Sequence, residues 1–377
     1  MRQLAIAAAA MVAFLAAATG GVLLTAQFWM VRWLDSVLSQ PGVVEGSHGA
    51  VRYSLWTGHL VIDDLAVTVI SPVPQAFRAA HLEAEGVGPR FLIDLACGKT
   101  ALRLKALRGR QVAAEDGALH ASIAALEIDD PAYDGGSAAE PPQVFFRRLH
   151  LAHATFGDRH EADGSIGDAV LTMDGTLGKP TAGTARIAAF ALPPLPLAKN
   201  GTLGPISVDL DSKVAFEAGP RRLTTELHLR LPGMRDLDLS LRLAALPSTI
   251  LAPQWMFLAL ALAPTRIEAL ELRYVDDDWA ETERSLEAAA TALGVPRRRD
   301  DVIAALEAQR AEIADDAQDG AKETLLASLD ALERFLRQGG TLTLTLAPPR
   351  AVTFGELALR RQGNAVALAQ LLGLSIR

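Results

Sequence analysis

A group of metal-ligand side chains lies between residues 150 and 163. The group consists of two histidines in an alternating run and the polar stretch that follows, namely His150, His153, Asp158, His160, Glu161 and Asp163. Residues three apart on a strand point to opposite faces, so His150 and His153 share a site only if the strand breaks between them. The spacing matches no conventional zinc pattern. We therefore expect a solvated strand and a polar turn, and predict no metal and no other cofactor.

Two charged triplets are the other features with chemical potential. The run Asp276 to Asp278 lies where a strand pattern gives way to a helix pattern, and acidic residues favour the positive end of a helix. A calcium loop needs alternating oxygen ligands and a closing glutamate in a fixed frame, which this run lacks. The run Arg297 to Arg299 falls between two expected helices. It fits a solvated turn, with lipid head groups or a cell-wall anion as the alternative ligand.

No signature of a common enzyme class occurs in the sequence. There is no P-loop, dinucleotide fingerprint or nucleophile elbow. The single cysteine, Cys97, cannot form an intramolecular disulfide and is expected to be a small buried residue. The net charge of −8 disfavours binding to phosphate backbones. We predict that the protein is not an enzyme and does not bind nucleic acid.

An uncharged apolar run near the N-terminus predicts a membrane helix. It extends over 23 residues from Leu4 to Ala26, which as a helix is about 34 Å long, enough to cross a hydrocarbon core of about 30 Å. Trp29 and Trp33 follow, four residues apart and beside Arg32. Aromatic and basic residues favour the membrane–water interface, so we predict that Trp29, Arg32 and Trp33 lie there.

The alternative to an anchor is a cleaved signal peptide, with Ala16 to Ala18 as the cleavage site. The apolar run continues beyond these alanines through Leu24, which favours an uncleaved anchor. Both interpretations place the rest of the chain outside the cytoplasm. With so short an N-terminus, we predict a single-pass protein of the inner (cytoplasmic) membrane with a periplasmic main domain.

Beyond Pro41 the apolar residues recur with period two, as in antiparallel sheets that are wet on one side. The run from Leu237 to Leu243 alternates strictly, and Gly58 separates two shorter alternating runs as a hairpin turn does. At Asp276 the period becomes that of a helix. The predicted fold is α+β and mainly β: a transmembrane anchor (1–33), a long antiparallel amphipathic β meander (34–275), a three-helix segment (276–338), and a final strand and short helix packing on the β domain (339–377).

The anchor, the strand–Gly–strand unit from Leu55 to Leu65 and the repeated amphipathic strands together resemble the AsmA-like proteins of the Gram-negative envelope. The resemblance covers roughly residues 1–130, and the helical segment 276–338 departs from the usual pattern of that group. It implies an apolar β groove that holds or passes lipid chains, and a role in envelope homeostasis. It identifies no functional residues.

Two classes of function fit these observations. The first is a membrane-anchored, non-enzymatic protein that handles lipid in an apolar β groove. The second is a periplasmic scaffold that binds another envelope protein through the helical segment. The apolar strand face fits both a groove and a face packed on a second sheet or on the helices.

Overall fold

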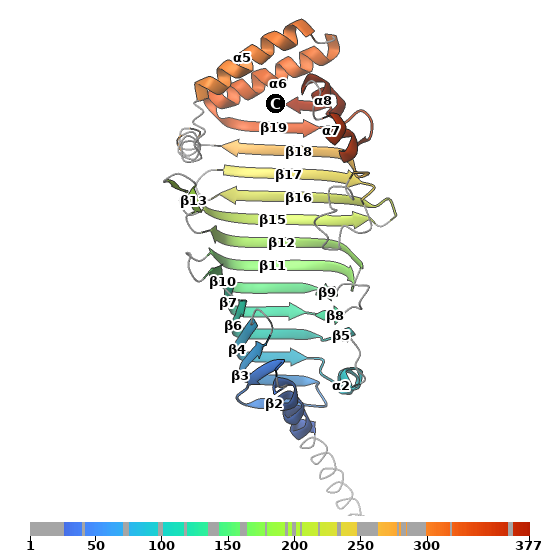
Figure 1. Ribbon diagram of the computed structural model, residues 1–377. Coiled ribbons are helices and arrows are strands. Elements are labelled where there is room, and N and C mark those ends of the chain that lie inside the picture. Colours follow the sequence, from blue (N-terminus) through green and yellow to red (C-terminus); the bar gives the residue numbers. More distant parts are fainter. Residues whose placement is uncertain are drawn as a thin grey trace, which may run out of the picture. The chain divides into compact units, whose positions relative to one another are not determined.

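The computed structural model describes most of the chain beyond residue 25, as two compact units. The described residues are 26–39, 42–70, 75–96, 101–116, 119–134, 143–158, 164–177, 179–192, 195–197, 201–203, 206–217, 219–231, 235–246, 263–276, 279, 284, 299–316, 319–360 and 365–377. Unit 1 comprises residues 1–172 and 176–178, and unit 2 comprises 173–175 and 179–377. Each unit is built around antiparallel strands (Figure 1).

Unit 1 consists of a helix over residues 26–38, a curved run of long strands, a short helix and three very short strands. Its elements after that helix are β1 (Val44–Ser47), β2 (Val51–Ser54), β3 (His59–Val69), β4 (Gln75–Glu85), α2 (Pro89–Ala96), β5 (Ala101–Arg103), β6 (Ala106–Asp116), β7 (Leu119–Asp129), β8 (Ala132–Asp134), β9 (Gln143–Phe145), β10 (Arg148–Asp158) and β11 (Gly164–Thr176). The main sheet has the order β1-β3-β4-β6-β7-β10-β11, with β2 beside β3. A separate three-stranded sheet has the order β5-β8-β9.

A row of left-handed residues keeps the apolar side chains of unit 1 on one face. Asp64 has a φ of 52°, and it interrupts the β3–β4 ladder without shifting the register. Ile62 and Leu65, on either side of it, therefore both pack against helix 26–38, although three residues of regular strand would place them on opposite faces. Gln111 in β6 and His153 in β10 have the same conformation, with φ of 49° each.

Unit 2 consists of long strands followed by helices that alternate with short strands. Its elements are β12 (Lys179–Leu192), β13 (Leu195–Leu197), β14 (Gly201–Leu203), β15 (Ile206–Glu217), β16 (Arg222–Leu231), β17 (Arg235–Ala244), β18 (Arg266–Asp276), α5 (Arg299–Asp316), α6 (Asp319–Gln338), β19 (Gly340–Leu346), β20 (Val352–Thr353), α7 (Phe354–Arg360), α8 (Ala365–Leu372) and β21 (Leu374–Ile376). The strand order is β12-β15-β16-β17-β18-β19-β21, β20 pairs with β18, and β13 pairs with β14.

The apolar face of unit 2 is built from leucine rows and is covered at its C-terminal end by α6. Phe335 of α6 is 7% exposed and packs edge-on against Tyr274 of β18 and against Trp279, with ring centroids 5.8 and 4.9 Å apart. The indole Nε1 of Trp279 donates a hydrogen bond to the Leu336 carbonyl oxygen at 2.9 Å. At the end of α6, Gly339 is left-handed and its amide donates to the Phe335 carbonyl oxygen at 2.7 Å.

The prediction of a mainly β, antiparallel chain with a helical segment near its end is confirmed. Several elements match closely: the β2–β3 hairpin closes at left-handed Gly58, Asp300 and Asp301 lie in the first turn of α5, and α8 covers 365–372. The first of the three expected helices is described only at Trp279 and Arg284. The domain boundaries at 34, 276 and 339 stay predictions.

Some local expectations are wrong. The alternating residues 102–105 predict one strand, but β5 ends at Arg103 and the long strand begins at Ala106. The sequence predicts a surface loop from Tyr133 to Pro142 and a turn at Asp174 and Gly175, but Tyr133 lies in β8, and Asp174 and Gly175 lie inside β11. Asp276 ends β18, is 2% exposed, and accepts a hydrogen bond from the Tyr274 hydroxyl at 2.9 Å. Of the helix expected after it, only Trp279 and Arg284 are described, so its role as a helix cap stays a prediction.

No helix in the described part of the chain is long and apolar enough to span a membrane. The predicted span, Leu4 to Ala26, lies outside the described residues except for Ala26.

Candidate functional site

Helix 26–38 has one face on the protein and one face exposed. Met30, Leu34 and Leu38, each four residues apart, are buried, with 3, 8 and 5% exposure. The predicted interface residues lie away from this stripe: Trp29 is 63% exposed, Trp33 is 38% exposed, and Arg32 is also exposed. The structure thus brings Trp29, Arg32 and Trp33 together on the outer surface of one helix, with Phe28 (59% exposed) beside them.

The inner face of this helix covers the first strands of unit 1. Met30 packs with Tyr53, Ala84 and Val87, while Leu34 and Leu38 pack with Ile62 and Leu65. The Gln27 amide adds two polar contacts to β2: it donates to the Val51 carbonyl oxygen and accepts from the Tyr53 amide. Helix 26–38 is therefore part of the folded unit, and in Figure 1 it lies across the end of the sheet at β2 and β3.

A charged pair ties the middle of the helix to the loop after β1. His48 Nε2 is 2.9 Å from Asp35 Oδ1, and His48 Nδ1 is 2.9 Å from the Gly49 carbonyl oxygen. Both partners are acceptors, so both ring nitrogens must carry protons for the two bonds to coexist. The bond to the Gly49 carbonyl, opposed by burial and aided by Asp35, raises the pKa of His48.

Beyond the helix, the apolar face of unit 1 stays partly open. Leu126 pairs with Leu151 and Ile128 with Leu149 across β7 and β10. All four side chains are only half-buried, and they belong to neither of the clusters that helix 26–38 forms. Leucine and isoleucine side chains on the packed side of a sheet are usually fully buried, because burial stabilises each of them by about 1.5–3 kcal/mol. This part of the face can therefore accept an apolar ligand.

A cavity of about 600 Å³ lies on this face at the strand ends farthest from the β2–β3 turn. Its floor is one register row that includes Val67, Phe77, Ala114, Ala121 and Phe156. Its remaining lining residues are Val69, Gln75, Ala76, Glu115, Asp116, Leu119, His120 and Gly157. The volume is in the range of small-molecule sites, and an apolar floor with a few polar groups at the rim suits a lipid chain better than a charged substrate.

The opposite face of unit 1 carries cross-strand ion pairs. His81 Nδ1 is 2.7 Å from Asp63 Oδ1, and Arg108 Nη1 is 2.6 Å from Glu85 Oε1. The hydrogen bond from His59, at 2.5 Å, lowers the pKa of Glu83 although partial burial opposes the shift. Such half-exposed pairs fix strand register and add little stability.

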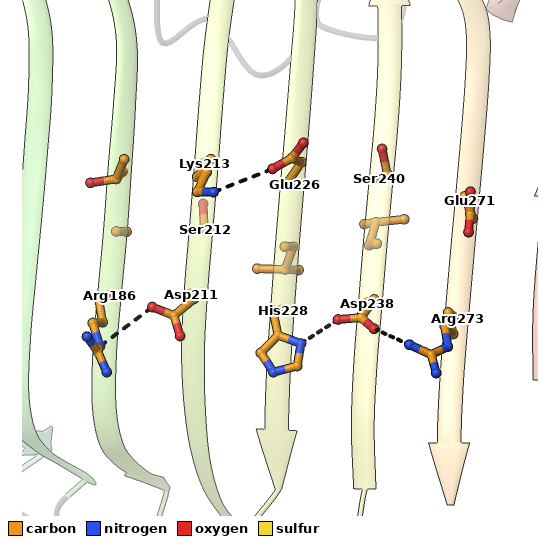
Figure 2. A pocket seen from close by; sticks show the side chains of 14 residues that line it. Arg186, Asp211, Ser212, Lys213, Glu226, His228, Asp238, Ser240, Glu271 and Arg273 are labelled. Atoms are coloured by element: carbon orange, nitrogen blue, oxygen red, sulfur yellow. Dashed lines mark hydrogen bonds and ion pairs between the residues drawn. The ribbon is translucent and has the colours of Figure 1, made fainter. Parts of the chain in front are cut away.

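Unit 2 has a polar hollow of about 670 Å³ on the charged face of its strands (Figure 2). Figure 2 shows charges in cross-strand pairs: Arg186 with Asp211 at 3.7 Å, and Lys213 with Glu226 at 3.9 Å. A third group joins His228 to Asp238, whose other oxygen is 3.6 Å from Arg273. Arg186 and Lys213 are more than 70% exposed. The hollow is a solvated charge ladder, in which Arg186, Asp211, Lys213, Glu226, Asp238 and Arg273 each face an opposite charge.

Of the metal-type residues, His150, His153 and Asp158 lie in the described part of the chain, all of them in β10. His150 is bound by carboxylates on the strands on either side, with Nε2 at 2.7 Å from Asp168 Oδ1 and Nδ1 at 3.8 Å from Glu127 Oε2. His153 is the left-handed residue that interrupts β10, so the strand does break where a shared site would require it. The described residues hold no group of three or more metal-ligand side chains. His160, Glu161, Asp163, Cys97, Asp277, Asp278, Arg297 and Arg298 lie outside the described residues.

Two further exposed apolar side chains belong to segments that pack against the start of helix 26–38. Trp56 in the β2–β3 turn is 69% exposed, and Ile93 on α2 is 61% exposed. Leu55 and Phe91, close to them in the sequence, pack against the cluster that contains Met30. The sequence predicts neither residue as an interface residue, because neither follows an uncharged run like the one before Trp29.

The comparisons with known proteins bear on unit 2 alone. A family model described as "Uncharacterized protein" matches residues 228–377, from within β16 to the end of the chain. No curated protein matches the chain.

Proposed function

We propose that the protein is a non-enzymatic, AsmA-like protein anchored in the inner membrane by one N-terminal helix, with a periplasmic body that holds or passes lipid chains. The single observation that carries this proposal is the cavity of about 600 Å³ on the open apolar face of unit 1. The chemistry required is burial of hydrocarbon, which depends on apolar area and needs no catalytic group.

The anchor part of the proposal is supported by the apolar run before residue 26 and by the exposed aromatic side chains after it. The uncharged run from Leu4 leads into helix 26–38, whose exposed side carries Phe28, Trp29 and Trp33. Large aromatic side chains left in water are unfavourable, whereas at a lipid interface they are stabilised. Arg32 lies among them, as a partner for lipid phosphate.

The lipid part is supported by the distribution of burial across unit 1. Helix 26–38 covers the face over β3 and β4, yet the rows on β7 and β10 remain half-buried and the cavity lies among strands β3 to β10. A protein whose sheet served only as a core would close these rows with a helix or a second sheet.

The test uses the full chain in vesicles that contain a phospholipid with a photoreactive acyl chain. Crosslinks are mapped by peptide mass spectrometry, and we expect them on the cavity floor at Phe77 and Phe156. Ala114→Phe fills the floor, and should lower this labelling about tenfold. The matched control is Ala113→Phe, which places the same ring on the opposite face because neighbouring residues of a strand alternate. Equal labelling of both variants, or none in the parent chain, would contradict a lipid-holding function.

The helical segment supports a second candidate, a scaffold that binds another envelope protein. Most of the α5 side chains whose burial is described are exposed, and Ile303 and Ile313 are buried in this helix, which packs against α6. Crosslinking in cells, with exposed α5 residues replaced by a photoreactive amino acid, tests this candidate. Recovery of one protein from α5 positions, but not from exposed positions of β16, would favour the scaffold.

A further inference from the structure

Three segments that are distant in the sequence meet at one end of unit 1. They are the start of helix 26–38, the β2–β3 turn (residues 55–58) and α2 with the residues before it. Ala26, Leu55 and Phe91, one from each segment, all pack against the same buried cluster of Met30, Tyr53, Ala84 and Val87. The meeting point is therefore a packed part of the unit.

Hydrogen bonds fix these segments to one another. The amides of Gly86 and Val87 both donate to the Gly58 carbonyl oxygen at 2.9 Å, which joins the turn to the residues before α2. The Tyr53 hydroxyl donates to the Val87 carbonyl oxygen at 2.8 Å, and the Tyr53 amide donates to Gln27 of the helix. A Cβ atom at Gly58 would lie 3.2 Å from the Gly88 amide nitrogen, and the φ of 64° is left-handed, so a side chain here would be both crowded and strained.

Each segment leaves a large apolar side chain in water beside the one that it buries. Trp29 is next to Met30, Trp56 is next to Leu55, and Ile93 is two residues after Phe91. In the described part of the chain, the exposed tryptophans are Trp29, Trp33 and Trp56, and all of them belong to this end. Arg90, one helical turn before Ile93, is exposed as well.

We infer that this end of unit 1 docks flat on the bilayer, with Trp56 and Ile93 inserted at the interface beside Trp29 and Trp33. The inference rests on the proposed membrane anchor, because it takes the bilayer to lie where the uncharged run from Leu4 meets the unit at Ala26. Bulky apolar side chains with nearby arginines are the composition that binds an anionic lipid surface from the side. Docking adds contacts of Trp56 and Ile93 with the bilayer, which a flexible tether would not make. These contacts fix the orientation of the apolar face of unit 1 relative to the membrane.

The experiment places a fluorescent label at single cysteines in the full chain, in vesicles of zwitterionic and anionic phospholipid. Cys97→Ser removes the native thiol, and Trp56→Cys, Ile93→Cys and Ile70→Cys each supply one labelling site. Ile70 is the matched control, because it is apolar and 42% exposed, follows Val69 at the strand end opposite His59, and is not among the residues that line the cavity. Thermal unfolding of each labelled variant checks that the fold is kept.

We expect lipids with a spin label near the head group to quench the fluorescence at positions 56 and 93 several-fold more than at position 70. Equal quenching at the three positions would overturn docking by this end. Absence of quenching at 56 and 93, in chains that resist extraction from the vesicles, would overturn docking and leave the anchor intact. A chain that does not stay with the vesicles would overturn both the anchor and the docking surface.

Discussion

Helix 26–38 in unit 1 and α6 in unit 2 have the same packing role. Each covers the apolar face of strands with a buried stripe, which contains Met30, Leu34 and Leu38 in the first and Leu325 and Phe335 in the second. Amphipathic helices commonly bury such a stripe against a sheet. The inner faces alone would not show that the helices differ.

Their outer faces are opposite in character. On α6 the outer residues form ion pairs, with Arg337 at 2.9 Å from Glu333 and Arg310 of α5 at 2.9 Å from Asp330. Helix 26–38 instead exposes Phe28, Trp29 and Trp33. Burial of the inner face is a requirement of folding, so the outer face is what reports the surroundings of a helix. The contrast is what the proposed lipid interface at helix 26–38 requires, and the comparison can be tested on both helices.

The largest effect should come from the inner face of α6. Phe335→Ala removes a buried ring and two edge-on aromatic contacts, and should lower the free energy of unfolding of unit 2 by about 3–5 kcal/mol. Chemical denaturation followed by tryptophan fluorescence measures it. Arg334→Ala, on the exposed side of the same helix, is the control and should change the value by less than about 0.5 kcal/mol. A small effect of Phe335→Ala would mean that α6 only rests on the sheet.

The inner face of helix 26–38 should respond in the same way. Met30→Ala leaves a void next to Tyr53 and Val87, and should cost about 2–4 kcal/mol of unfolding free energy in unit 1. Hydrogen exchange should become faster in residues 26–38. Ser36→Ala, at an exposed position of the same helix, should leave both the exchange and the unfolding free energy unchanged. If Met30→Ala behaved like Ser36→Ala, the helix would belong to the membrane anchor and not to unit 1.

Much of this comparison could be predicted from local pattern. Strict alternation predicted β16 and β17, and the spacing of Leu325, Leu329 and Leu332 predicted α6, because these periods arise from backbone geometry alone. The three-residue step from Ile62 to Leu65 also signals the left-handed Asp64, since regular alternation cannot place both on one face. The four-residue spacing of Met30, Leu34 and Leu38 likewise fits the buried face of helix 26–38.

The cavity and the proposed docking end could not be predicted in this way. Val67, Phe77 and Phe156 share a cavity only because β3, β4 and β10 have a particular order and register. The segments that carry Trp56 and Ile93 meet the start of helix 26–38 only through the cluster around Tyr53 and Val87. Such contacts depend on tertiary packing between segments far apart in the chain, which carries no periodic signal.

The outer faces are compared directly by giving helix 26–38 the charge that α6 carries. In the double variant Trp29→Glu/Trp33→Glu, transfer to a lipid interface should become less favourable by about 2 kcal/mol. Because both side chains are exposed, the unfolding free energy should change by less than about 0.5 kcal/mol. Alkaline extraction of membranes measures the first quantity, and we expect a larger extracted fraction. The conservative control Trp29→Phe/Trp33→Phe should extract like the parent chain. Equal extraction of both variants would remove the contrast between the two helices.

The smallest effect should be a pH dependence found at helix 26–38 alone. Hydrogen bonding to the Gly49 carbonyl, with Asp35 as the second partner, raises the pKa of His48 above its ordinary value of about 6.5. The folded state therefore binds the proton more tightly than the unfolded chain. The resulting stabilisation is complete below pH 6.5 and is lost as the pH rises through the raised pKa. Protection factors, which compare the exchange rate with the intrinsic base-catalysed rate at the same pH, should fall in residues 26–38 over that interval, whereas those of α6, which has no histidine, should not change. His48→Gln should make the protection factors of both helices equally insensitive to pH, and an unchanged pH profile in that variant would assign the effect to another group.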